Sequence, residues 1–227
     1  MRPYERIKGT TDALHKVWIE KCSEFLCASH PGIFRFRRMC REIVQDFDRI
    51  ETLDIRKPRV GVVGEILVKY SPTANNHVVE LLESEGAEAV VPDLADFMLY
   101  CFKNQEYKAE HLGMSKRTAR LTGWGIKAIE WARRGYTDAC RRSVHFDPPA
   151  DIHETAENAE SIVSLGNQTG EGWFLTGEMV ELIKNGVENI VCAQPFGCLP
   201  NHVVGKGVIK KLRTTYPGTL RLCAQII

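Results

Sequence analysis

The feature that most constrains the fold is a short apolar run without polar alternation, Val60-Gly61-Val62-Val63-Gly64. A strand of a parallel sheet has helices on both faces, so its side chains are apolar on both sides. Comparable runs occur at 87–91, 161–165 and 189–192. We expect these runs to be neighbouring strands of one parallel sheet.

Segments with helical spacing of apolar residues separate the runs, which is the alternation typical of an α/β protein. Helices are expected from Ser71 to Gly86, through Phe97 and Cys101, over 116–142, from Leu175 to Gly186, and from Val203 to Leu212. Residues 104–115 are polar and without periodicity, which predicts a loop. The fold class is therefore α/β with an open, mostly parallel sheet, flavodoxin- or Rossmann-like, in three layers.

The first fifty residues predict a helical hairpin placed before this sheet. Apolar residues recur at helical spacing from Leu14 to Leu26 and again from Phe36 to Ile50, and Pro31-Gly32 interrupts the pattern. We expect two parts: a helical segment over 1–57 and an α/β domain over 58–227.

The charge balance excludes some classes of partner. Thirty Lys+Arg against twenty-nine Asp+Glu leave a net charge of +1, so the positive excess that nucleic acids and anionic membranes attract is missing. No stretch approaches the roughly 18 apolar residues of a membrane span, and residues 1–6 lack the apolar core of a leader. We therefore expect a cytoplasmic protein.

The eight cysteines contain no CxxC pair, and in a reducing compartment free thiols are expected. Five of them are expected to act as small buried hydrophobes: Cys22, Cys27, Cys40, Cys101 and Cys140.

Ligands of open α/β sheets bind beyond the carboxyl ends of the strands. Glu65 follows the first run, and Glu171 closes the glycine-rich loop Gly166-Asn167-Gln168-Thr169-Gly170. Both acids are candidate general acid–base groups at the rim, and the loop is a candidate anion and cofactor site at a helix start. A purely structural role is the alternative for each acid. Glu65 would belong to an ordinary capped start of a helix, and Glu171 would be an acid in the first turn of a helix, where the helix dipole favours a negative charge.

The segment from Cys192 to His202 contains the remaining candidate functional residues. Cys192 ends a strand, and Cys198 lies before an expected helix whose N-terminus favours a thiolate. Both are candidate metal ligands, and with His202 they form a weak zinc set. Lys206 does not complete a P-loop, because Gly207 follows it instead of Ser or Thr.

These stretches resemble the 2-hydroxyacyl-CoA dehydratase family, and most closely its long activase-related proteins. The resemblance covers about Arg2 to Gly218 and is carried by Arg59–Glu65, Gly166–Trp173 and Gln194–His202. It implies flavodoxin-type domains that hold a [4Fe–4S] cluster through three cysteines. It also implies an ATP-dependent activator, which supplies an electron for removing water from a 2-hydroxyacyl-CoA thioester.

Position by position, Cys198 matches the family's cluster cysteine, and Cys192 is its neighbour. The other two cluster cysteines and the activator's ATP-binding motifs have no counterpart here, and 219–227 depart from the family's acidic Asp-Pro-Gly segment. We therefore expect a C-terminal fragment, whose partner is the activator or the missing dehydratase portion. A cluster-free binding or assembly domain and a zinc-binding structural domain are the alternatives.

Overall fold

A computed structural model describes residues 1–28, 32–217 and 221–226, the last segment without its side chains. The chain forms two compact units. The first comprises Met1–Arg56 and Trp124–Pro149, and the second comprises Lys57–Gly123 and Ala150–Ile227. Residues 124–149 thus group with the N-terminal helices, although they lie within the range 58–227 expected for the α/β domain.

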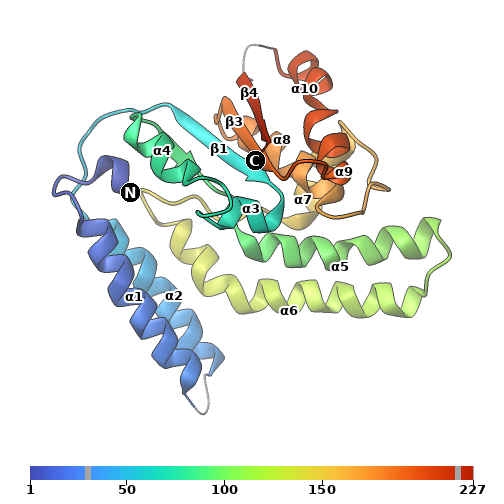
Figure 1. Ribbon diagram of the computed structural model, residues 1–227. Helices are drawn as coiled ribbons and strands as arrows, with labels where there is room; N and C mark the ends of the chain where they lie inside the picture. Colours follow the sequence, from blue (N-terminus) through green and yellow to red (C-terminus); the bar gives the residue numbers. More distant parts are fainter. Residues whose placement is uncertain (29–31, 218–220, 227) are drawn as a thin grey trace. The chain divides into compact units, whose positions relative to one another are not determined.

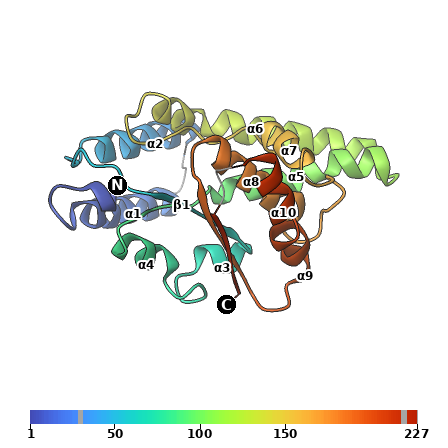
Figure 2. The ribbon, with the colours of Figure 1, turned by 90° about the horizontal axis from the view of Figure 1, so that it is seen from above.

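The first unit is helical. It contains η1 (Arg2–Tyr4), α1 (Thr10–Cys27), α2 (Ile33–Asp48) and the later part of α6 (Lys116–Cys140). Helices α1 and α2 lie side by side (Figures 1 and 2), and the ring centroids of Phe25 and Phe36 are 6.4 Å apart. Val44, Ala139 and Cys140 form a small core.

The second unit is an α/β structure built on a small, open, all-parallel sheet. Its strands are β1 (Arg59–Gly64), β2 (Glu88–Val90), β3 (Asn189–Gln194) and β4 (Arg221–Ile226), in the order β2-β1-β3-β4. Figure 1 shows them side by side. The parallel sheet is confirmed, and three of the four expected runs supply strands.

The expected strand at 161–165 is wrong, because these residues form turns after α7 (Ile152–Glu160). The amides of Ile162 and Val163 both donate to the carbonyl of Ala159, at 2.9 and 2.8 Å. Ile162 is nevertheless buried in the main core. A short apolar run is buried equally well in a turn, so its composition did not distinguish the two structures.

The helix expected from Ser71 to Gly86 is present, but its expected start at Ser71 is wrong. α3 (Ile66–Tyr70) ends before Ser71, and α4 (Val78–Ser84) begins after a turn. The buried side chain of Asn75 forms this turn, since it donates to the carbonyl of Val68 at 2.9 Å and accepts from the Val78 amide at 3.2 Å.

The expected loop over 104–115 is helical for most of its length, because α5 (Leu94–His111) extends through it. Asn104 is 5% exposed and accepts a 2.7 Å hydrogen bond from the indole of Trp173. Tyr100 packs edge-to-face on the same indole, with ring centroids 5.0 Å apart. The polar segment is thus helical because Asn104 has a buried hydrogen-bond partner in a distant part of the chain.

The core lies between the sheet and α8 (Gly172–Lys184). Gly61 allows this helix to approach β1, since a Cβ at Gly61 would lie 2.6 Å from Leu182 Cδ1. The helix expected over 203–212 is divided into α9 (Leu199–Asn201), a π-helical turn η2 (His202–Lys206) and α10 (Ile209–Thr215). Among the described helices, none combines the length and apolar character needed to cross a membrane.

Candidate functional site

The candidate site is built where β1 and β3 end together. Gly64 pairs with Ala193 in the parallel register. The backbone of Gly64 has φ +138°, and a Cβ there would lie 1.8 Å from the Ala193 carbonyl oxygen. Only glycine tolerates this approach. It brings Glu65, after β1, to the same edge as Gln194, the last residue of β3.

Glu65 and Glu171 come together at this edge through Asn201. Glu65 Oε2 caps α3 by accepting from the Val68 amide at 2.8 Å, and Glu171 Oε1 accepts from the Ile66 amide at 3.0 Å. With the Asn201 amide oriented to satisfy both its atoms, its nitrogen donates to Glu171 Oε2 at 2.7 Å and its oxygen accepts from the Glu65 amide at 3.1 Å. The two acids therefore brace the edge of the sheet.

This arrangement assigns the acids a definite structural role. Glu171 is 6% exposed, and each of its carboxylate oxygens accepts a hydrogen bond from the protein. Asn201 is fully buried. In this conformation the Glu171 carboxylate holds α3 and α9 at the edge of the sheet.

A buried ion pair lies close to the hydrogen bonds of Glu65, Glu171 and Asn201. Lys69 Nζ is 2.7 Å from Glu178 Oε1, and both side chains are 4% exposed. The Lys69 ammonium also lies 4.8 Å from the centroid of the Tyr70 ring. Burial raises the pKa of Glu178, and the Lys69 ammonium opposes this shift only in part. The pair joins α3 to α8 directly below the edge.

The glycine-rich loop lies at the same edge. A Cβ at Gly170 would lie 3.4 Å from Pro200 Cβ, so the loop touches α9. Tyr100 donates its hydroxyl to the carbonyls of Gln168 and Gly170, at 3.1 and 3.0 Å. Gly166, Thr169 and Gly170 are exposed, and Asn167 and Gln168 are half-buried.

The side-chain amide of Gln168 is the unusual group in this loop. Its nitrogen and oxygen are both buried and have no hydrogen-bond partner among the described residues. Asn167, by contrast, donates its amide to the Ser164 carbonyl at 3.0 Å and accepts at its own carbonyl from the Trp173 amide at 2.7 Å. Asn167 therefore shapes the loop, and Gln168 is the member with unused hydrogen-bonding capacity.

Cys192 and Cys198 occupy different environments. Cys192 is fully buried, and burial, with nearby Glu178 and Glu171, raises its pKa to about 12. Cys198 is half-buried in the loop after β3 and precedes the three-residue helix α9. So short a helix offers little of the dipole expected to favour a Cys198 thiolate.

The loop around Cys198 is exposed and apolar. Phe196 and Leu199 are 87% and 73% exposed. His202 Nδ1 lies 3.0 Å from the Cys198 carbonyl oxygen and 3.4 Å from Gln194 Nε2. Gln194 is fully buried, and its Oε1 has no partner among the described residues. His202 thus links the Cys198 loop to the end of β3.

The other described cysteines divide into two groups. Cys140 is buried and Cys22 and Cys40 are half-buried, while Cys27 and Cys101 are exposed. The expectation of burial is therefore wrong for Cys27 and Cys101, which lie on solvent faces of α1 and α5. The side chain of Cys223 lies outside the described residues.

Within the described part of the chain, no group of three or more His, Cys, Asp or Glu side chains is placed to hold a metal ion. Half-buried Cys198 could supply a single ligand to a cluster, and Cys192 is enclosed beneath Gly205. A [4Fe–4S] cluster needs a complete first shell of ligands. The described residues do not supply one, so we derive no reaction step through a cluster.

Sequence reasoning missed the residues that connect this edge: Lys69, Glu178, Gln194 and Asn201. Their common signal is a polar side chain inside an apolar helical or strand segment, which requires a buried partner.

Scans against protein-family models, curated proteins and solved structures find no match to this chain.

Proposed function

We propose that the α/β unit is the cysteine-bearing part of a 2-hydroxyacyl-CoA dehydratase-like component of the cytoplasm. One observation supports this most directly: Cys198 lies half-exposed at the carboxyl edge of the sheet, in an exposed apolar loop. In this proposal Cys198 supplies one thiolate to a [4Fe–4S] cluster, and another segment or chain supplies the rest. An ATP-dependent activator is the proposed electron donor.

The loop 166–170 is the proposed contact for the CoA thioester. Gly166, Thr169 and Gly170 leave its backbone exposed, and the Gln168 amide has unused hydrogen-bonding capacity. Glu65 and Glu171 act here as positioning residues, since they tie the loop, α3 and α9 together through Asn201. A flavodoxin-like, three-layer arrangement after an N-terminal helical hairpin is part of the same proposal.

A cluster-free binding or assembly domain is the second candidate. Two observations favour it: the described residues place no three metal ligands together, and the two acids at the edge are engaged in internal hydrogen bonds. This candidate requires the same docking on a larger dehydratase or activator, without iron.

Anaerobic reconstitution of the whole chain tests the first candidate. Ferrous iron and sulfide are added with 2-mercaptoethanol, which can provide the thiolates that the chain lacks. Wild type and the exposed-cysteine control Cys101→Ala are expected to bind iron and absorb in the visible, and Cys198→Ala is expected to lose both.

Iron retained in full by Cys198→Ala contradicts the assignment of this cysteine. A wild type that takes up no iron under these conditions contradicts the first candidate and favours the second.

A further inference from the structure

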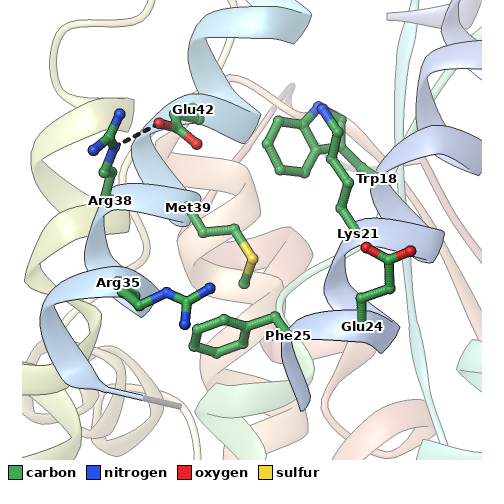
Figure 3. A pocket seen from close by; sticks show the side chains of 8 residues that line it. All are labelled: Trp18, Lys21, Glu24, Phe25, Arg35, Arg38, Met39 and Glu42. Atoms are coloured by element: carbon green, nitrogen blue, oxygen red, sulfur yellow. Dashed lines mark hydrogen bonds and ion pairs between the residues drawn. The ribbon is translucent and has the colours of Figure 1, made fainter. Parts of the chain in front are cut away.

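The first unit contains a cleft that the proposed function does not use. It has a volume of about 440 Å³ and lies between α1 and α2 (Figure 3). Four residues of each helix line it: Trp18, Lys21, Glu24 and Phe25 of α1, and Arg35, Arg38, Met39 and Glu42 of α2. This volume lies in the range of small-molecule sites, which begins at about 300 Å³.

The apolar part of the cleft is formed by Trp18, Phe25 and Met39. Figure 3 shows Met39 between the rings of Trp18 and Phe25. Trp18 is 5% exposed, and its indole Nε1 is buried without an acceptor among the described residues. Because this atom has almost no accessible surface, the indole presents its ring, and not its N–H group, to the cleft.

The charges of the cleft favour an anion. Arg38 and Glu42 neutralise each other, with Arg38 Nε 2.8 Å from Glu42 Oε1. Of the remaining charged residues of the lining, Lys21 and Arg35 are cations and Glu24 is an anion. The cleft therefore carries a net positive charge of one.

The two cations are held against aromatic rings. Lys21 Nζ lies 4.2 Å from the centroid of the Trp18 ring, and Arg35 Cζ lies 5.9 Å from that of Phe25. A cation over a ring keeps its N–H groups available to an anion while its stem packs on apolar surface. Figure 3 shows Arg35 and Lys21 on opposite sides of Met39, so a ligand over Met39 lies between them.

We propose that this cleft binds a small organic carboxylate with an apolar body. The body packs on Phe25 and Met39, and Arg35 and Lys21 neutralise the charge of the carboxylate. This inference is independent of the function proposed for the α/β unit, because it involves only residues of the first unit.

Phenylacetate is a suitable probe, with phenylacetamide as its uncharged analogue. In ¹⁵N-correlated spectra of the whole chain, the four tryptophans give four indole signals. The signal that is missing in Trp18→Phe is expected to move on addition of phenylacetate and to saturate. Phenylacetamide is expected to bind at least about tenfold more weakly, which corresponds to the loss of one charge-assisted contact.

Two variants and a matched control test the site. Arg35→Gln and Lys21→Gln are each expected to weaken phenylacetate binding by about tenfold or more. Arg41→Gln removes an exposed arginine of the same helix that does not line the cleft, and it is expected to bind like wild type. Arg35 and Lys21 are both exposed, so neither substitution is expected to unfold the first unit.

The proposal is overturned if phenylacetate up to 10 mM leaves the Trp18 signal unmoved. It is overturned equally if the amide binds as well as the acid, or if Arg41→Gln weakens binding as much as Arg35→Gln does.

Discussion

Lys69 and Glu178 form an ion pair inside the α/β unit, with 2.7 Å between Nζ and Oε1 and 4% exposure of each side chain. The pair links the short helix after β1 to α8, the most buried helix of the described chain. Charges removed from water in this way depend on each other, because neither has solvent to replace a lost partner.

The first prediction follows from this dependence. Lys69→Met leaves the Glu178 carboxylate buried and unpaired, so it is expected to lower the free energy of unfolding by about 3–5 kcal/mol. The double variant Lys69→Met/Glu178→Leu removes both charges and is expected to recover most of that loss. Urea denaturation measures both values.

A surface pair serves as the control for this prediction. Arg49 and Asp46 are 2.9 Å apart, with the Arg49 side chain 75% exposed, so Arg49→Gln is expected to cost less than about 1 kcal/mol. A double variant that is as unstable as Lys69→Met would contradict the interpretation of the pair.

The second prediction concerns Glu181 and pH. Burial, with nearby Asp96 and Glu178, raises the pKa of Glu181 from 4.5 to about 7. The folded state therefore binds this proton more tightly than the unfolded state does. Its stabilising effect is complete below pH 4.5 and is lost as the pH rises through 7.

Between pH 5 and 8 the free energy of unfolding is thus expected to fall, and Glu181→Gln is expected to reduce this fall and to stabilise the protein at pH 8. Glu160→Gln changes an exposed acid of α7 and is the control. Urea denaturation at several pH values provides the measurement. An unchanged pH dependence in Glu181→Gln refutes the assignment.

The third prediction tests the close approach of β1 and β3. Gly64→Ala places a Cβ 1.8 Å from the Ala193 oxygen at a φ of +138°, so it is expected to cost about 3 kcal/mol or more. Gly123 of α6 has open space around a Cβ, and Gly123→Ala is expected to add about 0.5–1 kcal/mol. Thermal unfolding distinguishes the two, and equal melting temperatures would exclude the strained contact.

The fourth prediction concerns the order of thiol alkylation in native protein. Half-buried Cys198 is expected to react with iodoacetamide before Cys40 and Cys192, because burial raises the pKa of Cys40 to about 11 and that of Cys192 to about 12. Peptide mass spectrometry follows each site, and exposed Cys27 is the positive control. Labelling of Cys192 as fast as Cys198 without denaturant would show that β3 is open to solvent.

Much of the fold was predictable from local patterns. The non-alternating apolar runs at β1 and β3 are typical of strands that are covered on both faces of a parallel sheet, so the sequence pattern predicted these two strands. The apolar face of α8 and the glycine that ends it, Gly186, are equally local signals. The sequence also placed Glu65, Glu171 and Cys198 on loops after buried segments.

Only the tertiary structure decided which of these signals became which element. The run at 161–165 has the composition of a strand, yet it forms turns after α7, and β4 is the strand that lies beside β3. Asn104 lies in a polar stretch that is helical because Trp173, 69 residues away, is its hydrogen-bond partner.

The roles of the candidate residues depended on distant contacts in the same way. Glu65 and Glu171 brace the edge of the sheet because Asn201 lies between them, and the burial that separates Cys192 from Cys198 comes from helices packed over β3. A local pattern specifies which side chains avoid water. The partner that each buried polar group finds depends on chain segments far away in the sequence, and these meet only in the folded protein.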